Sequence, residues 1–240
     1  MREVCLVVPC FDEAKRLPRA AFATFLDVHP AFAICFVDDG SRDGTRALLD
    51  TMCAERPEQI SVTALPVNGG KAAAVRAGML AVASQRVARV IGYWDADLST
   101  PLDEAERLLA ALDADPACAV ALGSRVKRAG AAVERRLVRH LLGRLFATLA
   151  TLTVGLSVYD SQCGAKLFRA SVVPRLFEAP FTTRWLFDLE LLVRLQQAGA
   201  SLGTAVEVPL GAWREVGGSK LKIRDMLAVP FLLLQIRRRR

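Results

Sequence analysis

Short apolar runs bounded by polar turns fill the first half of the chain and predict buried β-strands. Five runs follow one another: "EVCLVVP", "FAICFVDDGS", "ISVTALP", "VARVIGYWDAD" and "CAVALGS". Their apolar residues are consecutive rather than alternate, which is typical of strands covered on both faces. We therefore expect a sheet with a packed layer on each side.

Three helical stretches separate these runs. Asp43–Glu55 is amphipathic, Gly70–Ser84 is rich in alanine, and Pro101–Leu112 has Ser99 or Thr100 as the expected N-cap with proline at the first turn. The alternation of strands and helices predicts an α/β fold, in which a Rossmann-like, mostly parallel sheet carries helices on both faces.

A basic segment follows the fifth strand. Arg125–Arg144 holds seven arginines and lysines against one acid, Glu134, and its apolar residues recur at helical spacing. This pattern predicts a basic amphipathic helix. Arg135 and Arg139 lie four residues apart and would share a helix face, where they could draw in an anionic lipid headgroup. The alternative is a solvated basic face whose leucines pack into the core.

The chain of 240 residues has a net charge of +7, which favours an anionic partner such as nucleic acid, an acidic lipid surface or a phosphorylated substrate. Nucleic acid is disfavoured because no basic motif is interleaved with aromatic residues. None of the six cysteines forms a C-x-x-C pair, so we expect buried free thiols and a reducing, cytoplasmic compartment. The sequence has no uninterrupted run of about 18 apolar residues, so we do not expect a membrane-spanning helix. The N-terminal apolar run is too short for a signal peptide.

Polar residues follow four of the predicted strands, in "PCFDEA", "DDGSRDGT", "DADLSTP" and "GSR". In an open α/β sheet the ligand lies outside the carboxyl ends of the strands, so these loops predict one shared site. Two dinucleotide-binding alternatives fail. No G-x-G-x-x-G follows the first strand, and "NGGK" has Leu65 and Ala72 where a phosphate loop needs glycine and serine or threonine.

The "DAD" sequence predicts a metal site. If the strand persists through Asp97, the carboxylates of Asp95 and Asp97 face one side, and their repulsion would raise the pKa of one of them. Mg²⁺ or Mn²⁺ would relieve that repulsion, because such an ion takes one or two carboxylates and leaves its other positions to water and substrate phosphates. Capping of the next helix by Asp97 is the alternative. We favour the metal because three other polar loops lie beside this one.

A metal-bound diphosphate implies a nucleotide. Asp38 and Asp39 can accept hydrogen bonds from a base N–H or a ribose hydroxyl, and Asp12 and Glu13 can do so from the first loop. The alternative for the second loop is an Asx-turn, which explains one of its aspartates more readily than both.

Eight segments, in this order, resemble the inverting glycosyltransferases of family 2, which have the GT-A fold. They are "VVPCFDEAKRLP", "FVDDGSRDGT", "NGGKAAAVRAGM", "DADLSTP", "GSR", "DSQCGAKLFR", "RWLFDLELL" and "GGSKLKIRDM", and they cover most of the chain. The later segments are most similar to the polyprenyl-phosphate branch, which includes dolichyl-phosphate glucosyltransferases and mannosyltransferases. Two positions depart from the family pattern: Asp12 stands where asparagine is usual, and Phe11 where many members have tyrosine.

The resemblance implies a role for each matching position. The residues that would line the nucleoside pocket are Pro9, Phe11, Glu13 and Asp39, with Lys71 near by, and Asp95 and Asp97 would hold the metal and the diphosphate. Arg125 would meet the acceptor phosphate or the diphosphate, and the residues of the acceptor-side loop would be Asp160, Gln162 and Cys163. Those near the sugar would be Trp185, Asp188 and Glu190, with Lys220 near the diphosphate.

The resemblance further implies one catalytic domain over residues 1–240, with a nucleotide-sugar half at 1–124 and an acceptor half with C-terminal helices at 125–240. The enzyme would move a hexose from UDP-glucose or GDP-mannose to a polyprenyl phosphate, as a cytoplasmic protein held peripherally at the inner face of an anionic membrane. A phosphate monoester is already ionised near neutral pH, so Asp188 would orient a sugar hydroxyl. If the acceptor were an alcohol, Asp188 would be the general base.

Two other classes remain open. One is a family 2 enzyme that acts on a glycan or small-molecule hydroxyl. The other is a non-enzymatic anion-binding protein, which leaves the paired aspartates unexplained.

Overall fold

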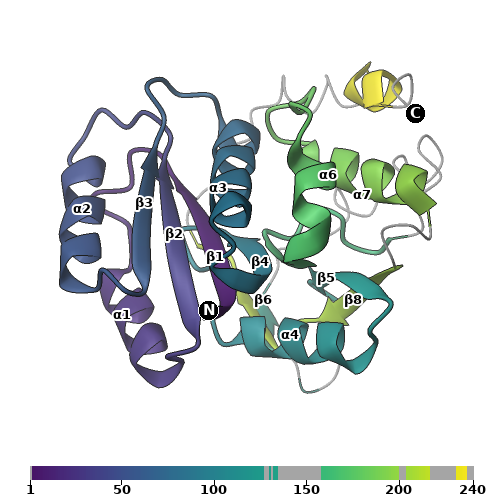
Figure 1. Cartoon of the computed structure of the whole chain (residues 1–240), viewed down its shortest axis with the longest axis horizontal. Coiled ribbons are helices and arrows are strands. Elements are labelled where there is room, and N and C mark those ends of the chain that lie inside the picture. The colour runs from purple at the N-terminus through teal and green to yellow at the C-terminus, as the bar shows by residue number, and fades with distance from the viewer. Residues whose placement is uncertain are drawn as a thin grey trace.

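A seven-stranded sheet runs through the part of the chain that the computed structural model describes, residues 2–126, 130, 132–134, 158–199, 204–216 and 231–236 (Figure 1). The strands are β1 (Arg2–Cys10), β2 (Phe32–Asp38), β3 (Ile60–Ala64), β4 (Ala88–Trp94), β5 (Cys118–Ser124), β7 (Ala165–Arg169) and β8 (Thr204–Pro209). The helices are α1 (Arg19–Val28), α2 (Thr45–Glu55), α3 (Lys71–Gln85), α4 (Glu104–Ala114), α6 (Val173–Phe177) and α7 (Phe187–Ala198). A separate two-stranded sheet pairs β6 (Ala132–Glu134) with β9 (Ala212–Arg214).

The strand order across the large sheet is β3-β2-β1-β4-β7-β5-β8. All neighbouring strands are parallel except for β7, which runs antiparallel to both β4 and β5. The predicted mostly parallel α/β sheet is therefore confirmed. One strand from late in the chain lies between two strands of the earlier series, and it brings its flanking loop to the centre of the sheet.

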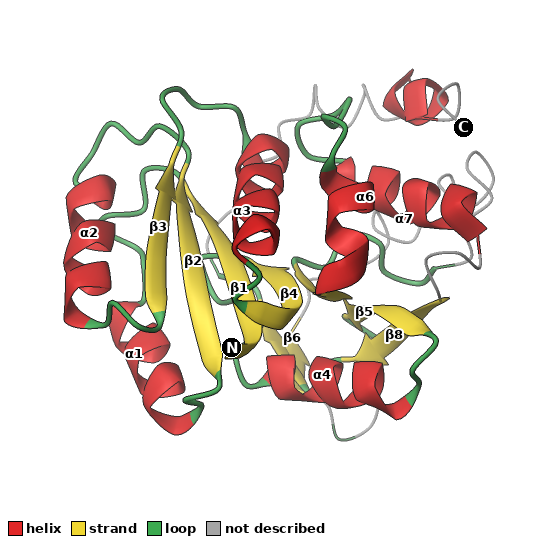
Figure 2. Cartoon of the chain, in the orientation of Figure 1, coloured by secondary structure: helices red, strands yellow, loops and turns green. Residues whose placement is uncertain are grey.

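Helices cover both faces of the sheet, as the consecutive apolar runs predicted (Figure 2). Alternate residues of β1 face opposite sides. Val4, Leu6 and Val8 pack with α1, α2 and α4, whereas Cys5 and Val7 pack with α3, α6 and α7. The polar loops at the strand ends are thus held on a sheet that is buried above and below.

β4 ends at Trp94, so the prediction that the strand persists through Asp97 is wrong. The next residues form a turn in which the N–H of Leu98 donates to the carbonyl of Asp95 at 3.2 Å. The buried indole of Trp94 donates through Nε1 to the carbonyl of Thr100 at 2.8 Å, which draws the chain back across the strand end. The two carboxylates of "DAD" therefore project from a turn instead of from one face of a strand.

The helix predicted to start at Pro101 begins at Glu104 instead, without a side-chain N-cap. The carbonyls of the expected capping residues are occupied by other elements. Ser99 accepts the N–H of Arg214 in β9 at 2.9 Å, and Thr100 accepts the indole of β4. These bonds hold Ser99 and Thr100 against β9 and β4, and the first helical residue of α4 is Glu104.

Strand β6 lies inside the segment predicted as one basic helix, Arg125–Arg144, so that prediction is wrong for residues 132–134. The N–H of Ala132 donates to the carbonyl of Gly211 at 2.8 Å, and the parallel pairing with β9 satisfies the backbone in an extended form. Arg135 and Arg139 lie outside the described residues, as does the predicted site residue Lys220.

All six cysteines are free thiols; five are buried and Cys53 is half-buried, which confirms the prediction of buried free thiols. Among the described residues, no helix combines the length and the apolar character needed to span a membrane.

Candidate active site

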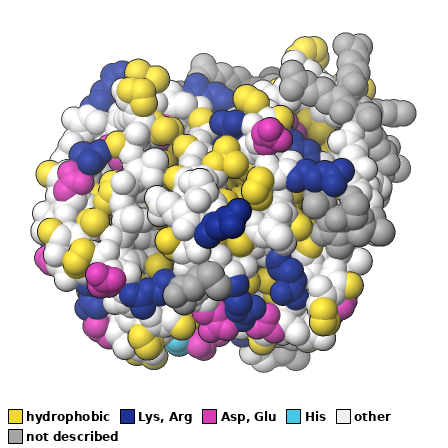
Figure 3. All heavy atoms as spheres, in the orientation of Figure 1, with side chains coloured by type: hydrophobic (Ala, Val, Ile, Leu, Met, Phe, Trp, Pro, Cys, Tyr) yellow, Lys and Arg dark blue, Asp and Glu magenta, His cyan; other side chains and the backbone are white. Residues whose placement is uncertain are grey.

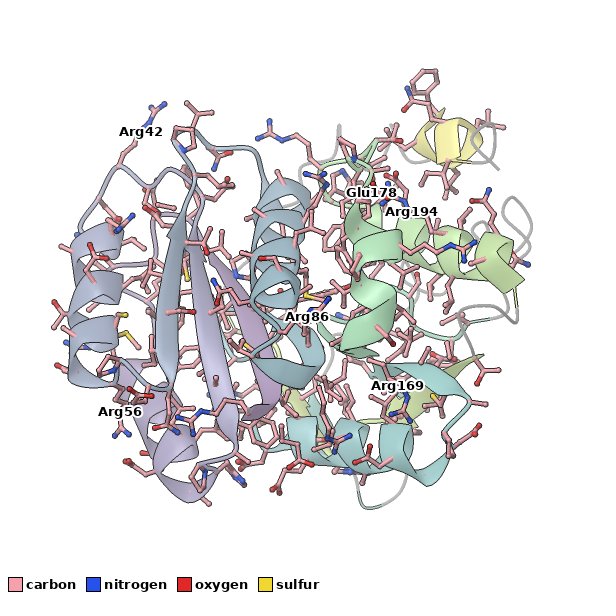
Figure 4. All side chains as sticks on the ribbon, in the orientation of Figure 1. Arg42, Arg56, Arg86, Arg169, Glu178 and Arg194 are labelled. Atoms are coloured by element: carbon pink, nitrogen blue, oxygen red, sulfur yellow. The ribbon has the colours of Figure 1, made fainter. Side chains whose placement is uncertain are left out.

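The loops after β1 and β2 are joined by hydrogen bonds. The backbone N–H groups of Asp12 and Glu13 donate to the side-chain hydroxyls of Ser41 at 3.1 Å and Thr45 at 2.8 Å. Asp12 has a positive φ of 51°, and its carboxylate accepts the N–H of Arg42 at 2.8 Å. Arg42, which lies in the loop after β2, is labelled in Figure 4. The two acids predicted to meet a nucleoside therefore lie against the second polar loop.

The two aspartates at the end of β2 make different contacts. The carboxylate of Asp38 accepts the N–H of Ser41, three residues on, at 3.1 Å. This is a local turn contact like the alternative considered, although an Asx-turn bonds the residue two positions on. The carboxylate of Asp39 accepts the N–H of Gly69 through one oxygen and that of Gly70 through the other, both at 2.8 Å. Asp39 thus fixes the "NGGK" turn against the end of β2. Pro9 and Phe11 lie half-buried at the end of β1.

Lys71 begins α3, and its ammonium contacts the third polar loop. Its Nζ lies 2.6 Å from Oδ1 of Asp95 and 5.8 Å from the centre of the Phe187 ring. Burial by itself lowers the pKa of Lys71, but the carboxylates of Asp95, Asp188 and Asp97 outweigh it, so the pKa is raised. The repulsion expected between the "DAD" carboxylates is therefore relieved by a side chain of the protein.

The oxygen donors of Asp95 and Asp97 are of the chemical type that suits a divalent metal taking its other ligands from water and phosphate. Asp97 is exposed, and its Oδ1 accepts the N–H of Ser99 at 2.9 Å. Within the described ranges, no group of three or more His, Cys, Asp or Glu side chains is placed to hold a metal. Mg²⁺ and Mn²⁺ need no such cage, because they bind through one or two carboxylates with water and substrate phosphates. The ammonium of Lys71 on Asp95 shows that positive charge is accommodated there.

Asp95 packs directly on the loop that precedes β7. Its N–H donates to the carbonyl of Gly164 at 3.1 Å. A Cβ on Gly164 would lie 1.9 Å from Oδ2 of Asp95, so this close approach requires glycine. The loop that carries the predicted acceptor-side residues Asp160, Gln162 and Cys163 is in this way brought against the predicted metal ligand.

Asp160, in the same loop, forms an ion pair with Arg125, which was predicted to meet the acceptor phosphate or the diphosphate. The guanidinium of Arg125 donates to both carboxylate oxygens of Asp160, at 2.6 and 2.7 Å, and lies 5.4 Å from the Trp213 ring centre. Burial by itself lowers the pKa of Arg125, but the carboxylate of Asp160 raises it by more. Near this pair in the chain, the buried Nε2 of Gln162 has no hydrogen-bond partner among the residues that the structure describes.

A buried ion pair beneath this loop was not predicted. The Nζ of Lys166 donates to the carbonyls of Ser161 at 3.0 Å and Cys163 at 2.5 Å, and to Oδ1 of Asp188 at 2.6 Å. The hydroxyl of Tyr93 also donates to Asp188. Burial, together with the charge of Asp188, raises the pKa of Tyr93 well above its usual value. Asp188 is therefore engaged by two buried donors.

Glu190 organises the loop before α7. Its carboxylate accepts the N–H groups of Thr182 and Thr183 at 2.8 Å and the Thr183 hydroxyl at 2.8 Å. Arg184 follows in this loop, donates to Oδ1 of Asn68 at 2.9 Å, and accepts an N–H from the first turn of α3 at 3.2 Å through its carbonyl. Glu190 thus secures the loop that docks on the "NGGK" turn.

Trp185 was predicted to lie near the sugar, and the structure places its ring in an apolar cluster. It is half-buried and packs against residues of α7 and of the short helical turn 231–236. That turn lies beside α7, near the C-terminal end in Figure 1.

The sequence carried a signal for one of the missed residues. Lys166 stands inside the apolar run "AKLF", and a lysine is almost never buried unless it is paired, so the run itself indicates a buried ion pair. Gly164 and Tyr93 carried no comparable signal, because their contacts depend on the placement of β7 beside β4.

Sequence comparison gives the family that the sequence motifs resemble. Residues 5–177 match the family described as Glycosyl transferase family 2. The dolichyl-phosphate beta-glucosyltransferase ALG5C of Trichomonas vaginalis is 35% identical over 242 residues, which cover 96% of this chain and 69% of the relative. The dolichyl-phosphate beta-glucosyltransferase of Homo sapiens is 31% identical over 234 residues, which cover 92% of this chain and 70% of the relative.

Solved structures of the GT-A fold resemble this one. Glucosyl-3-phosphoglycerate synthase from Mycobacterium tuberculosis in complex with UDP has a TM-score of 0.68 at 16% identity, over 98% of this chain and 80% of that one. Other crystals of that synthase hold Mg²⁺ or Mn²⁺ with UDP. Mannosyl-3-phosphoglycerate synthase from Rubrobacter xylanophilus has a TM-score of 0.70 at 16% identity, over 99% and 73% of the two chains. The predicted fold is confirmed and the family match covers most of this chain, so the chain belongs to glycosyltransferase family 2.

Proposed function

We propose that this family 2 enzyme transfers glucose from a nucleotide sugar to dolichyl phosphate or another polyprenyl phosphate, with inversion at the anomeric carbon. The observation that carries the proposal is the pair of carboxylates, Asp95 and Asp97, at a strand end that also bears Lys71. The names of the sequence relatives support the dolichyl-phosphate acceptor, and they favour glucose over mannose between the two donors considered, UDP-glucose and GDP-mannose.

On the donor side, Asp95 and Asp97 would hold Mg²⁺ or Mn²⁺, which would offset the negative charge that develops on the departing diphosphate. Lys71 lies against Asp95 and is close enough to contribute a second positive charge. The nucleoside would lie over the first two loops, against Pro9, Phe11, Glu13 and Asp39. Asp39 would act there chiefly through the "NGGK" turn, because both of its oxygens already accept backbone N–H groups.

On the acceptor side, an ionised phosphate oxygen would attack the anomeric carbon from the face opposite the diphosphate, with little need of a base. Arg125 and the Nε2 of Gln162, which finds no partner within the described ranges, would supply donors for an anionic head. Asp188 faces the ammonium of Lys166, which favours a positioning role over proton abstraction. The predicted roles of Lys220, Arg135 and Arg139 remain predictions.

Membrane contact would place the lipid acceptor at the site. On the turn 231–236, Phe231 and Leu234 leave 63% and 50% of their surface exposed, and four arginines follow in the sequence. Apolar side chains next to a basic cluster are suited to an anionic membrane surface. The buried free thiols fit a reducing compartment and hence the cytoplasmic face.

The anion-binding alternative gains no support from the visible surface. Figure 3 shows one face, where Lys and Arg side chains are spread among acidic and apolar ones instead of gathering in a single patch. A spread of this kind does not form the basic stripe that nucleic-acid binding requires.

The direct test offers radiolabelled UDP-glucose or GDP-mannose to the protein with dolichyl phosphate and Mg²⁺. We expect label from UDP-glucose in the lipid phase. Label on a soluble hydroxyl acceptor alone would favour the glycan alternative, and no lipid-phase label with either donor would refute the proposal.

The role of the carboxylates is tested by Asp97→Ala. We expect transfer to fall about a hundredfold or more, because a metal site supplies several kcal/mol of charge stabilisation. Circular dichroism should show an unchanged fold, since Asp97 is exposed. Asp50→Ala, on the exposed side of α2, is the control and should retain activity. Full activity of Asp97→Ala would remove the metal argument.

A further inference from the structure

The ion pair between Lys71 and Asp95 is open to a ligand. Nζ of Lys71 lies 2.6 Å from Oδ1 of Asp95, and the two side chains remain 34% and 38% exposed. The pair therefore lies where an incoming ion or phosphate can reach both partners, unlike the buried pair of Lys166 and Asp188.

The local fold determines where Lys71 lies. The carboxylate of Asp39 holds the N–H groups of Gly69 and Gly70, and Gly70 has a φ of 86°, which a residue with a side chain rarely adopts. α3 begins at the next residue, so Lys71 leaves the helix at a fixed point beside the end of β4.

Asp95 is fixed more firmly than its partner. Its N–H donates to the carbonyl of Gly164, and its carboxylate fills the space that a Cβ on Gly164 would occupy. Lys71 has a long, unbranched side chain with four rotatable bonds. If the pair separates, the ammonium is the group that moves.

A divalent cation bound to Asp95 would compete with the ammonium of Lys71 for the negative charge of that carboxylate. Two positive charges within a few ångströms repel strongly in a partly buried site, so a metal on Asp95 has to displace Lys71. A diphosphate changes this balance, because its oxygens offer the ammonium another partner. We propose that Lys71 is an internal counter-cation for Asp95, which keeps divalent metal away until the diphosphate of the donor draws the ammonium off. This inference rests on the proposed metal site at Asp95 and Asp97.

The consequence is thermodynamic coupling between metal and nucleotide. The nucleotide-free protein should bind metal weakly, and a nucleoside diphosphate should increase metal affinity both by providing ligands and by removing Lys71 from Asp95. Coupling of this kind is reciprocal, so metal should increase nucleotide affinity by the same factor.

The test measures Mn²⁺ binding, with free Mn²⁺ followed by electron paramagnetic resonance, in the absence and presence of UDP. Lys71→Met should bind Mn²⁺ without UDP about tenfold more tightly than the wild type, or better. The enhancement of Mn²⁺ affinity by UDP should be smaller in Lys71→Met than in the wild type. Lys71→Gln, which retains a hydrogen-bond donor without charge, should change in the same direction.

The matched control is Arg86→Met, which removes one positive charge from the opposite end of α3 (Figure 4). It should bind Mn²⁺ as the wild type does, and thermal unfolding should show that all variants are folded. If Lys71→Met binds Mn²⁺ no more tightly than the wild type, or shows an equal UDP enhancement, the counter-cation role is overturned. In that case loss of binding in Asp97→Ala would still uphold the metal site. If no protein binds Mn²⁺ even with UDP, the metal site and this inference both fall.

Discussion

Lys166→Met tests the buried ion pair beneath the acceptor-side loop. The ammonium of Lys166 is 1% exposed and donates to the carbonyls of Ser161 and Cys163 and to the carboxylate of Asp188. Methionine has nearly the same length but no charge, so Asp188 stays buried without its counter-ion. Removal of one partner of a buried pair costs about 3–5 kcal/mol. We expect about 3 kcal/mol, because Tyr93 still donates to Asp188.

The measurement is the free energy of unfolding in urea, followed by tryptophan fluorescence, for the wild type, the two single variants Lys166→Met and Asp188→Asn, and the double variant. With both charges removed, no buried ion is left unpaired. We therefore expect the double variant to lose less stability than the sum of the single losses, by about 1–3 kcal/mol. A single loss below about 1 kcal/mol, or strict additivity, would show that this pair is not the buried contact described here.

Two further predictions concern the loop that carries Gly164. Gly164→Ala places a methyl group 1.9 Å from Oδ2 of Asp95, so the rate of sugar transfer should fall about a hundredfold through displacement of that carboxylate. The control is Gly44→Ala, whose added Cβ lies 3.8 Å from its nearest neighbour and which should keep the wild-type rate. Equal transfer rates in the two variants would contradict the close approach. Burial raises the pKa of the Cys163 thiol from 9.0 to about 11. Between pH 9 and pH 11 the Cys163 thiol loses its proton in the unfolded chain but keeps it in the folded protein. Its contribution to the free energy of unfolding is therefore complete below pH 9 and falls over this range by roughly 1.4 kcal/mol per pH unit. Urea unfolding at pH 8 and pH 10 should show this decline, and Cys163→Ala should reduce its slope; an unchanged slope in that variant would refute the prediction.

The strands of the first half were predictable because each is a local pattern. β2, β3, β4 and β5 lie within the apolar runs that predicted them, and β1 extends one residue beyond its run at each end. Burial on both faces needs no information from elsewhere in the chain. β7 was not predictable in this way. Its placement between β4 and β5 depends on pairing with strands far away in the sequence, and its lysine made the run look less like a strand.

The site was predictable as a set of loops but not as a set of contacts. That polar residues would gather at the strand ends followed from the parallel sheet. The different contacts of Asp38 and Asp39 could not be read from two adjacent identical residues, because they depend on the position of the "NGGK" turn. The turn at "DAD" depends on the bond from the Trp94 indole to Thr100, and a single residue type does not reveal such a bond.

The insertion of β7 between β4 and β5 limits how this enzyme can be recombined. A chimera that kept residues 1–124 and took the remainder from a relative would keep Asp95 and Asp97 but replace the strand and the loop that pack against them. The neighbour that closes the sheet beside β4, and the glycine on which Asp95 rests, would both come from the other parent. The two sides of that boundary are therefore not independent structural units. A chimera that folds correctly should take the "GAKLF" segment, which holds Gly164 and most of β7, from the same parent as the "DAD" sequence.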